Sequence, residues 1–256
     1  MSTREEERPR GVQSVDRALD ILELLAGRHG TLGVTEIARE VALPAGTAHR
    51  LLMALSRRGW VRQDPGRRYG VGPAALRVGD ASSRELAALA LPALRAAVEA
   101  TGETANIAAL EDGAMVYLAQ APSPHTLRIF AEVGRRVPLH STAVGKVVLA
   151  GMDEARARAL LGDGELTART PRTLTTVDAV RQELQRVREQ GYAVDDEEQE
   201  LGVRCVAVPV GAGRWGDLAL SVSGPVERMT REHASSVVPR LQQIADDLTH
   251  RVLGGL

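Results

Sequence analysis

The chain of 256 residues is 44% hydrophobic and 25% charged, which is typical of folded globular protein, and its length predicts two domains. Its one cysteine, Cys205, excludes an intrachain disulfide and a zinc site built from several thiolates. No apolar run approaches the roughly 18 residues of a membrane helix, and the mixed-charge start MSTREEERPR differs from a signal peptide, so we expect a cytoplasmic protein with no membrane partner.

The whole chain has a net charge of −1. Its basic residues are concentrated in the N-terminal third. Residues 1–80 contain 13 Arg against 10 Asp and Glu, and the segment 43–72 contains six Arg against Asp64 alone. A local basic patch on a near-neutral protein is typical of phosphate binding. A basic surface that is merely solvated has the same composition, so charge alone does not identify a binding site.

The first sixty residues predict three helices. Apolar residues over 15–26 recur at three- and four-residue spacing and predict an amphipathic helix, with Ser14 at its cap. After a turn, Thr35 would cap a short second helix, and Pro44 would open a third helix that ends at Gly59. Two short helices joined tightly behind a longer one predict a helix-turn-helix. The stripe of the third helix that we expect to be buried is Ala48, Leu51, Leu52 and Leu55.

A basic hairpin is predicted directly after the third helix. The segments WVRQ and RRYGVG flank the turn residues Asp64, Pro65 and Gly66, which predicts the wing of a winged helix-turn-helix. The alternative is a small stabilising ribbon whose arginines lie in solvent. Base edges or phosphates would be contacted by the outward face of the third helix and by the wing. The candidate DNA-binding residues are Thr47, His49, Arg50, Arg57, Arg58, Arg62, Arg67 and Arg68.

The rest of the chain predicts an α+β domain behind a linker. An Ala- and Leu-rich segment over 83–101 predicts a linker helix that Pro92 kinks or restarts. Two apolar runs around Asp112 and Gly113 predict a hairpin over 105–120. We further expect strands at 127–130, 203–210 and 218–223, and helices at 142–151, 153–161, 176–190 and 230–253.

Several polar groups in this second domain are candidates for lining a pocket. Ser221 and Ser223 point to the same face of an apolar strand, where hydroxyl groups cost free energy unless they find a partner. The segment LHSTAVGK at 139–146 presents hydroxyl and backbone N–H groups at a helix start, which favours an anion. Cys205 and Asp195 are further candidates. In the alternative interpretation, both serines bond to backbone, Cys205 is a core residue and Asp195 caps a turn.

Enzymatic motifs are absent from the sequence. Gly145 and Lys146 suggest a phosphate-binding loop, but the first glycine and the final hydroxyl of that motif are replaced by His140 and Val147. No zinc or calcium pattern occurs, and no serine lies in a nucleophile elbow. We therefore expect no catalytic residue, no metal site and no cofactor.

Three stretches of the sequence resemble the IclR family of bacterial transcriptional regulators over about residues 11–254. They are SVDRALDILELLA with the following helices and wing, VGRRVPLHSTAVGKVVLA, and GYAVDDEEQELGVRCVAVPV followed by LALSVSGP. The resemblance implies a GAF-like C-terminal domain, dimers that pair into tetramers, and a small, commonly carboxylate, effector. By motif position it nominates as effector-binding residues Ile129, Val137, Ala143, Val144, Asp195, Val203, Cys205, Ser221 and Ser223.

The complete prediction is a two-domain regulator and not an enzyme. We expect a disordered tail at 1–10, a winged helix-turn-helix domain at 11–80, a linker helix at 81–101, and a GAF-like α/β sheet domain at 102–256. The homodimer or homotetramer would bind a double-stranded DNA operator, with an affinity that a small-molecule effector switches. The alternatives are a metabolic enzyme with a regulatory N-terminal domain and a nonspecific DNA-associated scaffold.

Overall fold

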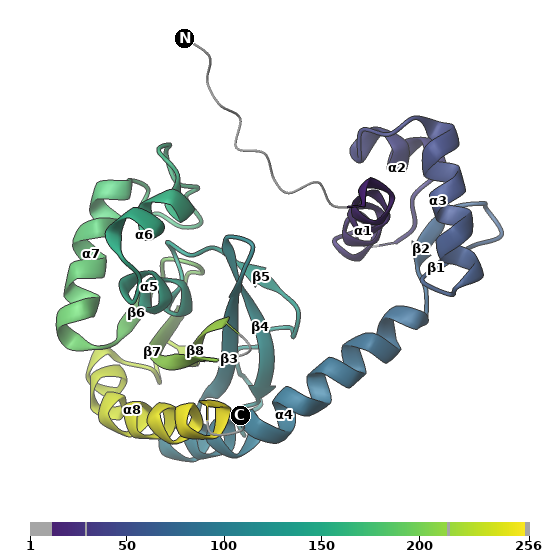
Figure 1. The fold of residues 1–256 in the computed structure, drawn as a ribbon. Helices are drawn as coiled ribbons and strands as arrows, with labels where there is room; N and C mark the ends of the chain where they lie inside the picture. Colours follow the sequence, from purple (N-terminus) through teal and green to yellow (C-terminus); the bar gives the residue numbers. More distant parts are fainter. Residues whose placement is uncertain (1–11, 29, 214–215, 254–256) are drawn as a thin grey trace, which may run out of the picture. The chain divides into compact units, whose positions relative to one another are not determined.

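The computed structural model describes residues 12–28, 30–213 and 216–253 (Figure 1). The tail predicted at 1–10 lies outside the described residues. Contacts within the chain separate two compact units, Met1–Ser82 and Ser83–Leu256. Each unit has its own hydrophobic core, and each is described by itself below.

The first unit contains the predicted helix-turn-helix and hairpin. Its elements are α1 (Gln13–Ala26), α2 (Val34–Glu40), α3 (Ala45–Arg57) and the antiparallel strands β1 (Val61–Gln63) and β2 (Tyr69–Val71). Of the predicted inward stripe of α3, Ala48 and Leu52 are fully buried, and Leu51 and Leu55 are partly buried. The small core joins all three helices to the hairpin through Ile21, Leu25, Ile37, Leu52, Val61 and Tyr69.

Both predicted N-caps in this unit are wrong. Helix α1 begins at Gln13 after Val12, so Ser14 lies inside its first turn. Helix α2 begins at Val34, and the Glu36 carboxylate accepts the backbone N–H of Gly33 at 2.7 Å. Thr35 is therefore the second residue of the helix and does not occupy the cap position.

The second unit is built on an antiparallel sheet of six strands in the order β5-β4-β3-β8-β7-β6. The predicted hairpin around Asp112 and Gly113 is confirmed. Both residues have positive φ, 44° and 75°, as a tight hairpin turn between two strands requires. The strands are β3 (Thr104–Glu111), β4 (Ala114–Ala121), β5 (Arg136–Val137), β6 (Ala193–Asp196), β7 (Val203–Gly213) and β8 (Gly216–Pro225).

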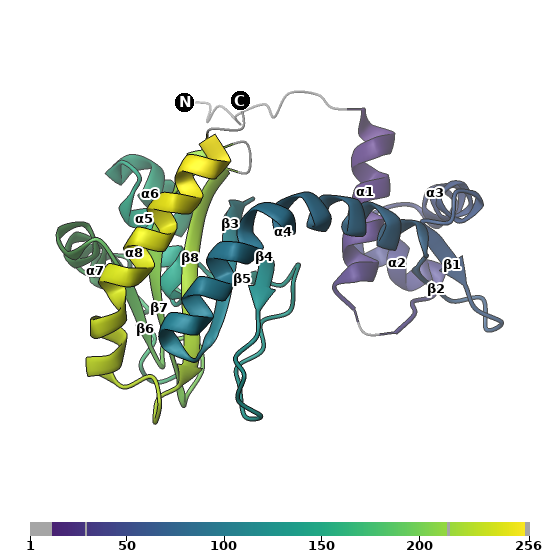
Figure 2. The same cartoon turned by 90° about the horizontal axis from the view of Figure 1, so that it is seen from below.

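Helices cover both faces of this sheet (Figures 1 and 2). On one face, the C-terminal part of α4 (Ala74–Thr101) lies beside α8 (Arg231–Leu253), and large residues such as Ile107 and Leu220 point to them. On the other face, α5 (Ala143–Ala150) packs on the small residues Ala207 and Ala219. Two further helices complete that layer, α6 (Glu154–Leu161) and α7 (Val177–Gln190).

Three expectations for this unit need correction. No strand occurs at 127–130, which is part of an irregular segment between β4 and β5. Helix α4 begins at Ala74, earlier than the predicted linker, and it continues through Pro92, so of the two predicted effects of this proline the restart does not occur. A proline removes one helical hydrogen bond, and burial of the neighbouring side chains Ala90 and Leu94 against the sheet stabilises the helix there. The short strands β5 and β6 were not predicted.

None of the helices in the described ranges combines the length and the apolar content that crossing a membrane requires.

Candidate functional site

The outward face of α3 displays most of the predicted DNA-binding residues. His49 and Arg50 are exposed in its first two turns, and Thr47 beside them is partly buried. Arg57 and Arg58 are exposed at its C-terminal end. The first turn of α3 contains no acidic residue and its N-terminus has no side-chain cap, so its free N–H groups remain available to an anion.

The hairpin carries three further arginines, which have different surroundings. Arg62 on β1 and Arg67 in the turn are exposed. Arg68 is also partly exposed, but its guanidinium donates to the backbone oxygen of Thr31 at 2.8 and 3.1 Å and pairs with Glu36 at 3.0 Å. Arg68 therefore fastens the hairpin to the segment before α2.

The Asp64 carboxylate stabilises the hairpin turn by accepting two hydrogen bonds. Its Oδ1 accepts the backbone N–H of Arg68 at 2.9 Å, and its Oδ2 accepts the hydroxyl of Thr31 at 3.0 Å. The hydrogen bond from Arg68 is the main cause that holds the pKa of Asp64 below its ordinary value. The acid that interrupts the basic segment thus has a structural role.

The second unit contains a cavity of about 50 Å³ between the sheet, the start of α5 and the irregular segment that follows β4. All nine predicted effector-binding residues line it: Ile129, Val137, Ala143, Val144, Asp195, Val203, Cys205, Ser221 and Ser223. Thr142 also lines it, within the segment 139–146 whose hydroxyl groups the sequence nominated. The sequence did not predict six others: Tyr117, Phe130, Ala131, Arg135, Gln199 and Glu200. Gln199 and Glu200 follow Asp195 closely in the sequence, and this proximity was the available signal for them.

The polar groups of the cavity align because of the sheet register. Thr104, Ser223, Cys205 and Asp195 are direct cross-strand partners on four neighbouring strands. The Cys205 thiol donates to the Ser223 hydroxyl at 3.0 Å. Ser221 is buried, and its hydroxyl has no hydrogen-bond partner among the described residues. Neither serine therefore follows the alternative interpretation in which both bond to backbone.

Asp195 both caps a turn and lines the cavity. Its Oδ1 accepts the backbone N–H groups of Glu198 at 2.8 Å and Gln199 at 3.2 Å. Burial raises the pKa of Asp195 to about 7, although these two hydrogen bonds act in the opposite direction. Burial also raises the pKa of the Cys205 thiol and of the Tyr117 phenol. At neutral pH the thiol and the phenol are therefore uncharged.

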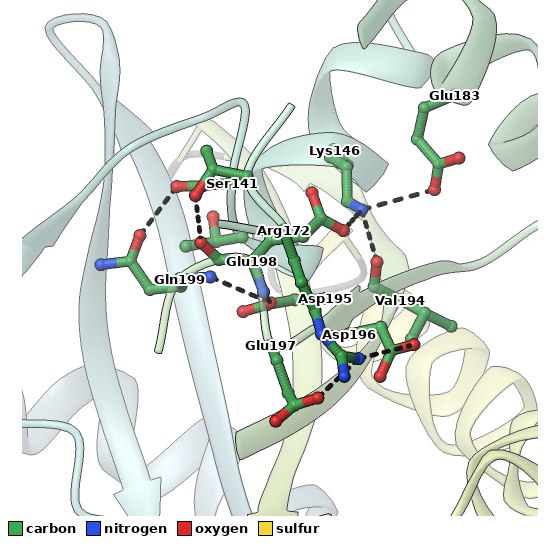
Figure 3. Close-up of polar contacts among 12 residues, drawn as sticks. Ser141, Lys146, Arg172, Glu183, Val194, Asp195, Asp196, Glu197, Glu198 and Gln199 are labelled. Carbon is green, nitrogen blue, oxygen red and sulfur yellow. Dashed lines mark hydrogen bonds and ion pairs between the residues drawn. The ribbon is translucent and has the colours of Figure 1, made fainter. Parts of the chain in front are cut away.

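A buried ion-pair network joins α5, α7 and the segment that contains Val194 and Glu198 (Figure 3). The Lys146 ammonium on α5 is fully buried and donates to Glu198 at 2.5 Å, to the backbone oxygen of Val194 at 2.5 Å and to Glu183 on α7 at 3.3 Å. Burial raises the pKa of Glu198, against the lowering effect of Lys146. Beside this network, the Ser141 hydroxyl donates to Gln199 Oε1 at 2.7 Å.

The Gly145–Lys146 pair has a structural explanation. A side-chain carbon at Gly145 would lie 2.3 Å from the backbone oxygen of Leu139, so only glycine fits where α5 starts. The ion pair of Lys146 with Glu198 then joins α5 to the segment 195–200 (Figure 3). Both the start of α5 and that segment line the cavity.

A larger groove of about 540 Å³ lies between α6 and α7. It contains none of the predicted residues, and charged groups on its rim form ion pairs with one another, such as Arg181 with Glu154 at 2.6 Å. In the described part of the chain, no group of three or more His, Cys, Asp and Glu residues is placed to hold a metal ion.

Family comparisons match both units. The model of the C-terminal domain of bacterial transcriptional regulators of the IclR type matches residues 79–250, and the IclR helix-turn-helix model matches residues 14–65. These two matches together span most of the chain.

Individual proteins match over similar lengths. The chain is 38% identical over 244 residues to the HTH-type transcriptional regulator BhcR of Paracoccus denitrificans, covering 93% of this chain and 87% of that protein. It is 35% identical over 245 residues to the transcriptional repressor IclR of Escherichia coli, covering 93% and 89%. A crystal structure of an IclR transcriptional regulator from Alicyclobacillus acidocaldarius matches 95% of this chain and 100% of its own, with a TM-score of 0.82 and 33% identity.

Proposed function

Because this chain belongs to the IclR family of bacterial transcriptional regulators, we propose that α3 and the hairpin bind operator DNA under the control of a small carboxylate in the cavity. The protein is a transcriptional regulator with a helix-turn-helix domain and a C-terminal effector-binding domain. Its relatives are named as regulators and repressors and the family is not enzymatic, so a metabolic enzyme is not supported.

The exposed residues of α3 and the hairpin divide into two proposed roles. Thr47, His49 and Arg50 lie near the start of the helix that enters the major groove in this motif, so they contact base edges. The exposed arginines at the end of α3 and in the hairpin contact phosphates. They are Arg57, Arg58, Arg62 and Arg67. Arg68 supports the wing, because its guanidinium already bonds to Thr31 and Glu36.

The proposed effector site is supported by one observation, the meeting around one cavity of the nine side chains that the family resemblance nominated. An ordered water needs roughly 10–15 Å³ of such space, so a cavity of about 50 Å³ admits an acid of only a few non-hydrogen atoms. Ser221, Ser223 and the first backbone amides of α5 at Ala143 and Val144 would donate to its carboxylate. A larger effector would have to displace the covering segment at Ile129–Ala131.

A second copy of the chain is the expected partner. Helix α1 and its cap expose three apolar side chains, Val12, Val15 and Leu19, with 49–68% of their surface in solvent, on one stripe at helical spacing. Covering this stripe in a homodimer would present two reading helices to a two-fold operator. Binding of the effector would then change the spacing or mobility of the paired wings. A DNA partner also supports a cytoplasmic location.

A mobility-shift assay on DNA from upstream of the protein's own gene tests this function. We expect a complex that survives nonspecific competitor DNA and raised salt, and that one member of a panel of small carboxylic acids dissociates or strengthens. The same panel should raise the melting temperature, since a ligand at about 100 times its Kd adds roughly 2.7 kcal/mol. Absence of any sequence-dependent complex would contradict the proposed function.

A further inference from the structure

The side-chain amide of Asn106 on β3 has a buried hydrogen-bond donor that lacks an acceptor among the described residues. The residue is fully buried, and its Nδ2 has no hydrogen-bond partner among the described residues. Its Oδ1 accepts from Gln120 Nε2 at 3.0 Å. An unpaired buried donor costs free energy, so it calls for a physical explanation.

The sheet places this donor beside the cavity. Strand β3 lies between β4 and β8, and Asn106 is the direct cross-strand partner of Gln120 on one side and of Ser221 on the other. Directly paired residues share one face of a sheet. The cavity is lined on the β8 side by Ser221 and on the β4 side by Tyr117 and Ala131. Two unpartnered polar groups, Asn106 Nδ2 and Ser221 Oγ, therefore belong to paired residues on the same face of the sheet, and Ser221 lines the cavity.

Gln120 fixes the orientation of the Asn106 amide. Its Nε2 also donates to the backbone oxygen of Ala131 at 2.9 Å. A backbone oxygen can only accept, so the amide nitrogen of Gln120 must lie at this end, and its second N–H meets the oxygen of Asn106. The Nδ2 of Asn106 is consequently turned away from Gln120. The same side chain joins Asn106 to the segment that covers the cavity.

We propose that Asn106 Nδ2 donates, together with Ser221, to the carboxylate of the effector, and that Gln120 is the residue that positions Asn106. This rests on the proposed function and adds a specificity determinant to it. A carboxylate presents only acceptors to the Asn106 donor, whereas a primary amide of the same shape can also present an N–H group to it. The site would thereby distinguish an acid from its amide. The contact to Ala131 would couple the bound carboxylate to the covering segment.

The test uses matched acid and amide probes on the full chain. Binding of propionate, lactate, propionamide and lactamide is measured by titration calorimetry or ligand-observed NMR. Wild-type protein should prefer each acid over its amide. Asn106→Asp keeps the size of the side chain and the acceptor for Gln120 but offers a donor only while its carboxyl is protonated, so the preference for the acid should fall with rising pH more steeply than in the wild type. Asn106→Leu, of similar volume and without a buried polar group, should lower the affinity for the acids by about tenfold or more.

Gln120→Met tests the positioning role. It should reduce the ratio of acid to amide affinity, whereas a purely structural loss would weaken both probes alike. Gln242→Met is the matched control, because Gln242 on α8 donates to the Gly191 backbone oxygen away from the cavity, and its ratio should equal that of the wild type. Circular dichroism confirms that each variant is folded.

The outcomes are separable. Acid binding by Asn106→Leu within twofold of wild type, or an acid preference in Asn106→Asp with the same pH dependence as in wild type, overturns the role of Asn106 while leaving the carboxylate effector intact. If wild-type protein binds its operator but none of the acids, the carboxylate of the proposed function is wrong, and this assignment is overturned with it.

Discussion

Lys146 and Glu198 form an ion pair of 2.5 Å in which the ammonium is fully buried, and this pair joins two walls of the cavity (Figure 3). One wall is the start of α5, and the other is the segment 195–200. Removing one partner of a buried pair leaves the other charge uncompensated, which is strongly destabilising. The pair therefore fixes the distance between two walls of the cavity that are far apart in the sequence.

Replacing Lys146 with Met should lower the free energy of unfolding by about 3–5 kcal/mol at pH 7.5, as measured by urea denaturation. The deficit should shrink at pH 5.5, because burial raises the pKa of Glu198 and its protonation removes the uncompensated charge. Lys146→Met combined with Glu198→Leu should recover part of the loss. Equal stability of wild type and Lys146→Met would contradict this account.

Binding of a carboxylate should depend on the protonation of Asp195. Burial raises the pKa of Asp195 to about 7, and a second carboxylate in the cavity favours the protonated form further. The affinity for the acid should therefore fall by up to about tenfold per pH unit as the pH rises from the free-state pKa of about 7 towards the higher bound-state pKa. Asp195→Asn keeps the acceptor for the Glu198 and Gln199 amides and should bind the acid without this dependence. Titration calorimetry from pH 6 to pH 9 measures the difference.

The Asp195 carboxyl should also make the stability of the fold depend on pH. Its folded pKa lies above the ordinary value near 3.9, so the unfolded chain ionises first as pH rises. The contribution of Asp195 to stability is complete below about pH 4 and is lost between about pH 4 and pH 7. The stability of Asp195→Asn relative to wild type should rise over this interval and become constant above it. A constant difference across the interval would show that Asp195 is ionised in the folded state.

Local signals in the sequence predicted much of this fold. Thr142, Asp153 and Thr176 each accept a backbone N–H at the start of α5, α6 and α7. Gly191 ends α7 in the left-handed region with a φ of 77°. Each of these residues acts on the backbone within a few positions, so a single sequence contains the necessary information.

The features that the sequence did not predict depend on long-range pairing. The apolar run at 127–130 resembles a strand but pairs with no neighbouring strand, and its residues Ile129 and Phe130 line the cavity instead. Asn106 and Gln120 are ordinary polar residues in an apolar hairpin until the register of β3 between β4 and β8 is known. The family resemblance nominated nine of the residues that line the cavity, whereas the placement of Asn106 and Gln120 depends on the pairing of distant strands.

Arg50 should determine sequence recognition. Its side chain is exposed in the second turn of α3, so Arg50→Ala should weaken specific binding by about 1–3 kcal/mol and relax the preference at one operator position. Arg28→Ala is the control, because Arg28 is exposed but pairs with Glu40 outside α3 and the hairpin. Quantitative mobility shifts on the operator and on single-base variants measure both effects. An affinity unchanged by Arg50→Ala would remove this residue from the reading face.

Ser221→Ala combined with Ser223→Ala should abolish the response to the effector while leaving DNA binding intact. Ser221 has an unpartnered buried hydroxyl, so its removal leaves no new unsatisfied group and should cost little stability. Ser223 accepts only a thiol hydrogen bond from Cys205 among the described residues. Mobility shifts with and without the acid measure the response. If the double variant still responds, the effector binds elsewhere.

The exposed stripe on α1 should determine assembly. Val15 and Leu19 lie four residues apart on one helix face and are about half exposed, and two carboxylates placed there cannot be covered by an apolar surface without a large desolvation penalty. Val15→Glu with Leu19→Glu should shift sedimentation toward a single chain and weaken operator binding, because a two-fold site then loses the benefit of joined reading helices. Leu127→Glu, at a more exposed apolar residue of the second unit, is the control. A double variant that sediments like wild type would exclude this stripe as the dimer contact.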